Sequence, residues 1–315
     1  MEENIFTYNF SAMKKLLIKI SFILIPIFLI SLIVEISIRN VPNDYSYKNE
    51  YLQKHSGDIE ILVLGSSHSF FGVNPEFFSL KAFNASNFSQ SLDYDYFIFN
   101  KFKENLKKLR YIFLPISYFT LFSNLEDGVE DFRVKDYVIY YDAPVPFYSK
   151  YRLEVLNSEY LKLIKRTYKN FTSEYSEITC SNLGFGRKYK DKKQKDLEIT
   201  GDDSSKRHTY DSFDKLEHNL LVLNKLIEEC ERLNIKIILF TPPSWKTYYE
   251  KLNGRQLYIM ESSCLSLAEK HANVSYYNYL KDSRFDIEDF HDADHLNDIG
   301  AKKFTLILEK IISDI

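Results

Sequence analysis

Apolar and polar residues follow one another along this chain in a pattern that predicts strands separated by helices. Short runs that are apolar at nearly every position indicate strands buried on both faces, and longer segments with apolar residues three and four positions apart indicate helices. The expected strands are residues 59–65, 81–86, 109–117, 235–243 and 274–280. The expected helices are residues 94–108, 213–234, 254–271 and 297–315. This alternation predicts an α/β domain with a doubly wound, five-stranded parallel sheet.

One apolar segment near the N-terminus is much longer than any strand. Residues 16–38 carry only two charges, Lys19 and Glu35, and both lie close to the ends, where they can reach a membrane surface. At about 1.5 Å per residue, a helix of this length crosses a hydrocarbon core of about 30 Å. We therefore expect a transmembrane helix after a short tail, residues 1–15. A cleaved signal peptide is the alternative, but no small-x-small cleavage site follows the run.

Positive charges predict the direction of this helix. Lys14, Lys15 and Lys19 cluster at its N-terminal side, whereas the charges from Arg39 onward are mixed. The positive-inside rule then places the tail in the cytoplasm and everything after the helix outside it. The expected location is the cell membrane, with a single pass and an extracytoplasmic main domain.

The rest of the chain divides into a linker and one large domain. Residues 39–58 are polar and read as a linker, and residues 59–315 carry the strands and helices. Within this domain, residues 121–212 break the alternation and are too long for an ordinary loop, so we expect an inserted subdomain near the site. Its basic run, residues 187–195, reads as a solvated loop or as a contact for an anionic polymer or lipid headgroups.

Composition excludes several classes of function. The 315 residues carry a net charge of −3, so no basic field favours nucleic acid as a partner. The three cysteines are far apart, and none is in a C-x-x-C pair. This argues against a disulfide framework and against a zinc ribbon.

Candidate chemistry lies at two distant places. The first strand ends in Gly65-Ser66-Ser67, and Asp292 and His295 have D-x-x-H spacing just before the last helix. This spacing lets the carboxylate reach one imidazole nitrogen while the other points toward a nucleophile. We expect Ser67 as nucleophile, His295 as general base and Asp292 as the group that orients it, with Ser67 about 2.6–3.2 Å from His295. Ser66 is the rival, but one step along a strand turns its side chain to the opposite face.

These residues resemble the SGNH, or GDSL-like, hydrolase superfamily. Its first block, Gly-Asp-Ser, is matched by Gly65-Ser66-Ser67, and its last block by Asp292 and His295. Residues 84–91 resemble its second block, in which Ser89 stands where the family has a glycine whose backbone N–H helps to form the oxyanion hole. The resemblance, which covers residues 59–120 and 213–315, implies a flavodoxin-like SGNH fold. The "TPP" after the fourth strand implies that Pro242 and Pro243 lie near the site.

One departure concerns the oxyanion hole. The family usually supplies an Asn side chain after the third strand, but this chain reads "PISYFT" there. Ser117 or Tyr118 could supply the donor instead, or the hole could depend on the N–H groups of Ser67 and Ser89 alone. The loss of one donor can cost roughly 100-fold or more in rate.

The histidines near these motifs have other interpretations. His68 is expected to pack or to form a hydrogen bond beside the site, since lone histidines usually do. The run His291, Asp292, Asp294 and His295 could be read as a metal cluster, but so many ligands on one turn do not converge easily. We expect neither a metal nor another cofactor.

The sequence thus predicts a membrane-anchored, extracytoplasmic serine esterase or O-acyltransferase that acts on acyl groups of a cell-surface glycan. The variant start, the anchor and the "DHLN" ending resemble proteins of teichoic-acid D-alanylation and polysaccharide O-acylation. The expected partners are the glycan or an acyl donor, the membrane, and a membrane protein that transfers acyl groups. The alternative is a non-catalytic scaffold or polymer-binding subunit with a decayed SGNH domain.

Overall fold

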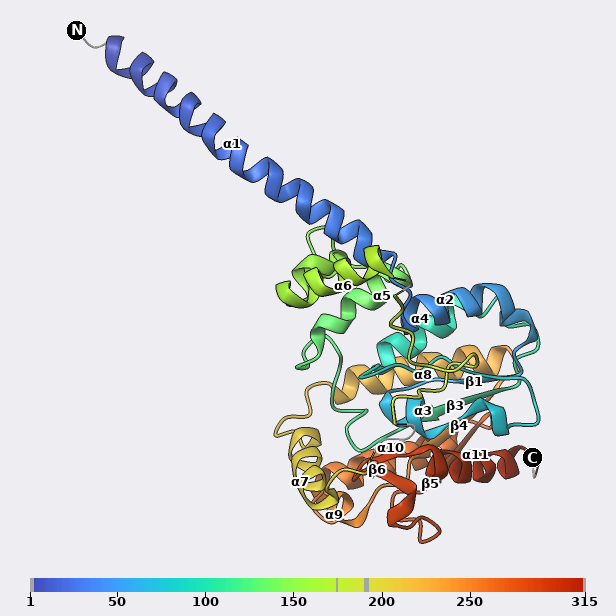
Figure 1. Cartoon of the computed structure of the whole chain (residues 1–315). Coiled ribbons are helices and arrows are strands. Elements are labelled where there is room, and N and C mark those ends of the chain that lie inside the picture. Colours follow the sequence, from blue (N-terminus) through green and yellow to red (C-terminus); the bar gives the residue numbers. More distant parts are fainter. Residues whose placement is uncertain (1–2, 174, 190–192, 314–315) are drawn as a thin grey trace. The chain divides into compact units, whose positions relative to one another are not determined.

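The computed structural model describes residues 3–173, 175–189 and 193–313, and the chain divides into two compact units (Figure 1). The first, called the helical unit here, comprises Met1–Pro42 and Pro144–Glu177. The second, called the sheet unit, comprises Asn43–Ala143 and Ile178–Ile315. The boundary runs through the insertion predicted for residues 121–212. Its middle belongs to the helical unit, and its two flanks belong to the sheet unit.

The elements have the following bounds. The helices are α1 (Glu3–Arg39), α2 (Asp44–His55), α3 (Ser67–Gly72), α4 (Leu92–Phe102), α5 (Val134–Tyr140), α6 (Tyr160–Thr172), α7 (Leu197–His208), α8 (Leu216–Arg232), α9 (Lys246–Tyr249), α10 (Gly254–Lys270) and α11 (Asp298–Ser313). The strands are β1 (Ile61–Val63), β2 (Ala82–Asn84), β3 (Tyr111–Pro115), β4 (Lys236–Thr241), β5 (Val274–Asn278), β6 (Phe290–Asp292) and β7 (His295–Leu296).

The sheet unit is built on five parallel strands in the order β2-β1-β3-β4-β5, which confirms the predicted α/β fold. Each expected strand is present, and each end is shorter than expected by at most two residues, because the flanking residues leave the ladder. Strands β6 and β7 form a separate antiparallel pair. The strand order changes direction between β1 and β3, and doubly wound sheets open their sites outside the carboxyl ends at such a point.

Both faces of the sheet are apolar, as the continuous hydrophobic runs predicted. Val63, Phe113 and Phe240 lie in one core cluster with side chains of α11, including Phe304 and Leu308. Residues between them along the strands, such as Leu62, Ile112 and Leu239, are also fully buried and by alternation face the other side, where α4 and α8 pack (Figure 1). Helices on both faces hold the carboxyl ends of β1 and β3 in fixed positions.

Residues 39–58, expected as a linker, contain helix α2. Asn43 caps it, since its side-chain oxygen accepts the N–H groups of Tyr45 and Ser46 at 3.0 Å. The helix is polar overall but buries a stripe at Tyr45, Lys48 and Leu52. Four of the twelve residues are buried, and two of these are charged, so no apolar period marks the helix in the sequence.

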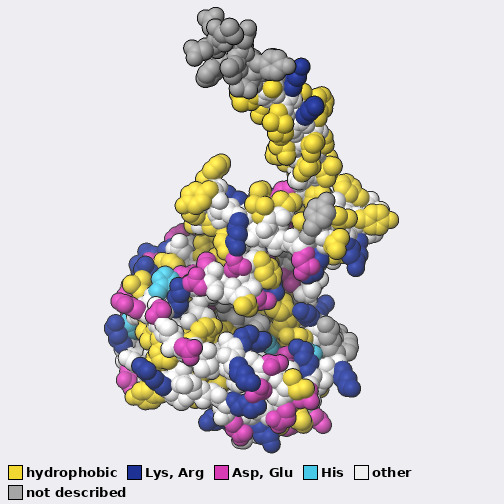
Figure 2. All heavy atoms as spheres, turned by 90° about the vertical axis from the view of Figure 1, so that its left-hand side faces the viewer, with side chains coloured by type: hydrophobic (Ala, Val, Ile, Leu, Met, Phe, Trp, Pro, Cys, Tyr) yellow, Lys and Arg dark blue, Asp and Glu magenta, His cyan; other side chains and the backbone are white. Residues whose placement is uncertain are grey.

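Helix α1 is long and apolar enough to cross a bilayer between Phe10 and Arg39, and none of its most apolar stretch is buried in the protein. Figure 2 shows hydrophobic side chains along this helix. Glu35, in its last turns, does not extend toward solvent as expected. Its carboxylate accepts the N–H groups of Glu154 and Val155 at 3.1 and 3.0 Å. The C-terminal end of α1 is therefore packed against residues 154 and 155 of the same unit.

The turn after β1 depends on a glycine. Gly65 has φ +107°, a conformation that L side chains rarely adopt, and its N–H donates to the buried carboxylate of Asp95 at 2.6 Å. A Cβ at this position would lie 2.2 Å from Cγ of Pro115 on β3. Position 65, in the turn after β1, therefore favours glycine over any residue with a side chain.

We expect Gly65→Ala to lower stability by about 2 kcal/mol or more, because it adds backbone strain to a clash with a rigid ring. Thermal unfolding of the purified chain measures this. Gly254→Ala is the matched control, since a Cβ there meets nothing within 4 Å, and it should leave stability unchanged or raise it by up to about 1 kcal/mol. Equal unfolding temperatures for both variants would contradict this account of the turn.

Candidate active site

Ser67 begins a helix where the sequence predicted the tip of a strand. Strand β1 ends at Val63, Ser66 has extended backbone angles and caps α3, and Ser67 is the first helical residue. The hydroxyl of Ser66 is buried and has no hydrogen-bond partner among the described residues. Ser66 and Ser67 do point in different directions, but a strand-to-helix turn is the reason, not strand alternation.

Asp292 and His295 face each other across a short hairpin. Asp292 ends β6, His295 begins β7, and the two are paired in the register of that ladder. The turn between them is held from outside, because the N–H of Trp245 donates to the carbonyl of Ala293 at 2.8 Å. Trp245 follows Pro242 and Pro243, so the segment after β4 supports the hairpin.

The structure brings the three predicted residues into one hydrogen-bonded chain. Oγ of Ser67 lies 2.9 Å from Nε2 of His295, and Nδ1 of His295 lies 2.8 Å from Oδ1 of Asp292. Both distances are in the range in which an imidazole can take a proton from a hydroxyl while a carboxylate fixes its orientation. The arrangement can therefore generate a serine alkoxide during attack on an electrophile.

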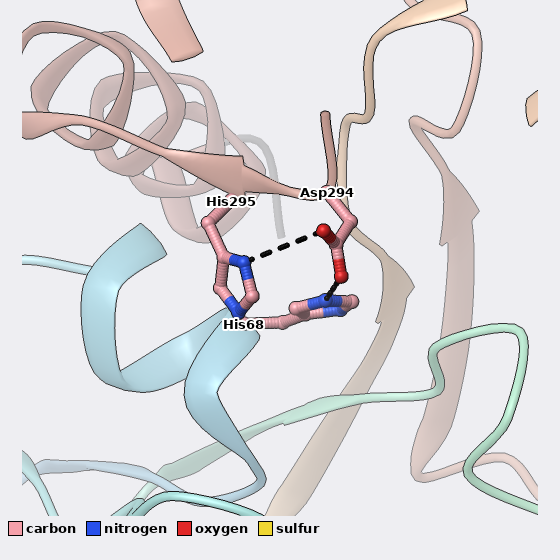
Figure 3. A group of neighbouring side chains, drawn as sticks. All are labelled: His68, Asp294 and His295. Atoms are coloured by element: carbon pink, nitrogen blue, oxygen red, sulfur yellow. Dashed lines mark hydrogen bonds and ion pairs between the residues drawn. The ribbon is translucent and has the colours of Figure 1, made fainter. Parts of the chain in front are cut away.

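A second carboxylate, Asp294, lies between two imidazoles (Figure 3). Its oxygens are 3.6 Å from Nδ1 of His295 and 3.5 Å from Nε2 of His68. The hydroxyl of Ser204 donates to it at 2.8 Å, and Ser117 lies 2.7 Å from the far nitrogen of His68. Asp294 is thus a buried charge with several polar neighbours, as a buried carboxylate requires.

Burial and the two carboxylates shift the pKa values of His295, His68 and His208 in different directions. Burial alone would lower the pKa of His295, but Asp292 and Asp294 raise it to about 10. Burial lowers the pKa of His68, and it lowers that of His208, which lies 3.9 Å from Asp294, to about 3. Of these three imidazoles, His295 is thus the one whose charged form the surroundings favour, and it must lose that proton before it can act as a general base.

The same group could also hold a cation. Ligand atoms of His68, Asp294 and His295 lie within 4.8 Å of one another. Both ring nitrogens of His295 already have hydrogen-bond partners, and a metal ion would have to displace them. Hydrogen bonds explain why His68, Asp294 and His295 lie together. This group is not the one considered from the sequence, which included His291, because the ring of His291 stacks on Tyr189.

The expected oxyanion-hole residues lie in different surroundings. Ser89 has φ +52°, so a serine here adopts the backbone region that glycine favours, and its hydroxyl donates to Glu130. The hydroxyl of Ser117 contacts His68. The hydroxyl of Tyr118 lies 3.0 Å from both Thr209 and the N–H of Asn253, so it is engaged away from the predicted role. The backbone groups of Ser67 and Ser89 remain the candidates.

The later flank of the insertion, residues 178–212, contributes side chains beside this site. Tyr189 stacks on His291 at 3.8 Å and meets the edge of His295 at 5.8 Å between ring centroids. Lys195 lies 3.2 Å from the second oxygen of Asp292. Part of the basic run expected as a solvated loop therefore contacts the carboxylate that orients His295.

Sequence reasoning missed several of these neighbours. Ser204, His208 and Tyr189 were given no role at the site, and Asp294 was considered only as a possible metal ligand. The adjacency of Asp294 to the D-x-x-H motif was the one available signal. Ser204, His208 and Tyr189 come from a segment about a hundred residues away in sequence, with no motif of its own.

The sequence matches no protein-family model and no curated protein. Among solved structures it is similar to a "putative acylhydrolase" from Bacteroides fragilis, at 11% identity and a TM-score of 0.41 over 84% of this chain and 95% of that one. It is also similar to a GDSL-like lipase from Bacteroides thetaiotaomicron, at 10% identity and a TM-score of 0.39 over 86% and 100% of the two chains. At these scores neither likeness bears on the activity, which must be argued from the site itself.

We expect the rate of ester cleavage to rise with pH as His295 loses its proton, with a midpoint above the usual imidazole value of about 6.5. Asp294→Asn removes one of the two negative charges that raise the pKa of His295, so the rising limb should move to lower pH. The measurement is kcat/KM for a p-nitrophenyl ester across the pH range.

Two variants serve as controls for this shift. Asp202→Asn removes an exposed carboxylate of the same helix as Ser204, paired with Lys206 at 2.6 Å, and should leave the profile unchanged. Asp292→Asn should lower kcat by about 10⁴-fold, because it removes the group that orients the base. A profile of Asp294→Asn that coincides with that of the parent chain would refute the electrostatic role of Asp294.

Proposed function

We propose that this chain is a serine esterase or O-acyltransferase of the SGNH type, anchored to the cell membrane by α1. The observation that carries the proposal is the hydrogen-bonded chain from Ser67 through His295 to Asp292, at 2.9 and 2.8 Å. A serine with these two partners, at the start of a helix beyond a parallel strand, is equipped to form and release an acyl-enzyme.

In the proposed reaction Ser67 attacks the carbonyl carbon of an acyl ester, and its proton passes to Nε2 of His295. The tetrahedral intermediate expels the alcohol, which takes that proton, and the acyl group stays on Ser67. A water molecule or a sugar hydroxyl then attacks the acyl carbon and loses its proton to His295. As the bond from that carbon to the Ser67 oxygen breaks, His295 returns the proton to Ser67, and the acyl group leaves as an acid or as a new ester. The first acceptor makes the chain an esterase, and the second makes it a transferase.

The developing oxyanion needs donors. The N–H of Ser67 is at the first position of α3, where helix N–H groups have no partner within the helix. The backbone of Ser89 has φ +52°, in the region that glycine favours. We propose these two N–H groups as the hole. A hole without an additional side-chain donor is consistent with a specialised enzyme of modest rate.

The substrate class follows from location. Lysines cluster at the N-terminal side of α1, so we propose that the sheet unit lies outside the cytoplasm. An esterase or transferase held there would act on acyl groups of a cell-surface glycan. A membrane protein that delivers the acyl group would be its natural partner in the transferase case.

We expect Ser67 to react with a fluorophosphonate, since its oxygen can displace fluoride from phosphorus while His295 takes the proton. Mass spectrometry of the labelled, detergent-solubilised chain should place the adduct on the peptide that contains Ser67. Ser67→Ala should abolish the labelling.

The control is Ser66→Ala, which removes a neighbouring hydroxyl that makes no hydrogen bond and should keep full labelling. An unlabelled but folded parent chain would favour the alternative function, a scaffold with a decayed site. Labelling that disappears only in Ser66→Ala would reassign the nucleophile.

A further inference from the structure

Helix α6, in the helical unit, exposes an apolar stripe along one side. Leu161, Ile164, Tyr168 and Phe171 are spaced by three or four residues and therefore share one face. Leu161 is 79% exposed, and Tyr168 and Phe171 are each 67% exposed. Four large apolar side chains on one exposed helix face exceed the single hydrophobic residues that a protein surface normally carries.

The opposite side of α6 is fixed to the end of α1. Leu163 is buried, and the side-chain amide of Asn170 donates to the carbonyl and the hydroxyl of Ser37 at 3.0 and 3.2 Å. Arg166 forms a two-pronged pair with Glu177, with both N–O distances 2.8 Å. The apolar stripe is therefore held beside residue 37 by contacts within its own unit.

The third side of α6 is basic. Lys162, Lys165 and Lys169 follow one another at helical spacing, and the helix has no acidic residue. Apolar residues on one side with lysines beside them are the pattern of helices that lie in the plane of a membrane interface. There the apolar face enters the acyl boundary, and the lysines meet anionic headgroups.

The depth of Ser37 in the membrane agrees with this pattern. The apolar part of α1 covers 30 residues from Phe10 to Arg39, or about 45 Å, whereas the hydrocarbon core is about 30 Å thick. Part of this helix must then lie outside the core, and the charged pair of Glu35 and Arg39, 2.6 Å apart, favours its last turns as a part that reaches the headgroup region. A helix tied to Ser37 lies at the height of that interface.

We propose that the exposed face of α6 lies in the headgroup region of the bilayer that α1 spans. The inference rests on the membrane anchor of the proposed function and adds a second attachment to it. The same unit exposes three further large apolar side chains, namely Phe147, Tyr148 and Leu156. A spanning helix and an interfacial helix joined by hydrogen bonds hold the helical unit in one orientation to the membrane.

Spin labels on the full chain test this directly. Leu161→Cys and Lys162→Cys carry a nitroxide at adjacent positions, about 100° apart around the helix, and Phe28→Cys reports on α1. Each variant is placed in discs of phosphatidylcholine and phosphatidylglycerol, and relaxation by oxygen is compared with relaxation by a water-soluble nickel chelate. The native cysteines are buried, so the unsubstituted chain gives the background.

We expect the label at position 161 to be reached by oxygen several-fold better than by nickel, and the label at position 162 to show the reverse. If label 161 is as accessible to nickel as label 162 while label 28 is shielded, the anchor stands and the interfacial helix is refuted. If label 28 is open to nickel, both fail. If label 161 is shielded from both reagents, protein covers the face instead of lipid, and the proposal is overturned.

Discussion

The hydrogen bond between His295 and Asp292 is the interaction on which the site depends. It fixes the orientation of the imidazole ring of His295. The other ring nitrogen, Nε2, then lies 2.9 Å from the hydroxyl of Ser67. The hairpin that carries both residues is only two short strands, too small to be stable alone. Contacts from outside support it: Trp245 holds Ala293, the N–H of Lys195 donates to the carbonyl of His291 at 2.8 Å, and Thr200 accepts the N–H of Ala293.

Two buried carboxylates side by side would repel each other and lose their hydration, so the hairpin needs a positive partner. His295 supplies it. Burial alone would raise the pKa of Asp294, yet the imidazole holds that pKa well below its usual value, and the pKa of Asp292 is lowered as well. The charged form of His295 therefore stabilises the hairpin, whereas only its neutral form can accept the Ser67 proton, so activity should require a pH at which this imidazole has lost its proton.

The sequence was sufficient for the sheet and for the three residues of the hydrogen-bonded chain, because both leave local signals. Strands buried on two faces are continuous apolar runs, and D-x-x-H requires only one turn of chain. It was insufficient for Tyr189 and Lys195, whose neighbours at the site lie about a hundred residues away along the chain, and for the contacts of Asp294 with His68 and Ser204. The same limit applied to Glu35. A charge near the end of an apolar helix looks like a surface residue until Glu154 and Val155 are seen to donate to it.

The central claim is that Ser67 becomes acylated through His295. Rapid quenching of the full chain with an activated acyl ester, followed by peptide mass spectrometry, measures this most directly. The account predicts one acyl group on the Ser67 peptide, lost in His295→Ala although Ser67 is intact. An acyl group on another serine, or turnover with no acyl-enzyme even when acyl transfer is faster than its release, would contradict it.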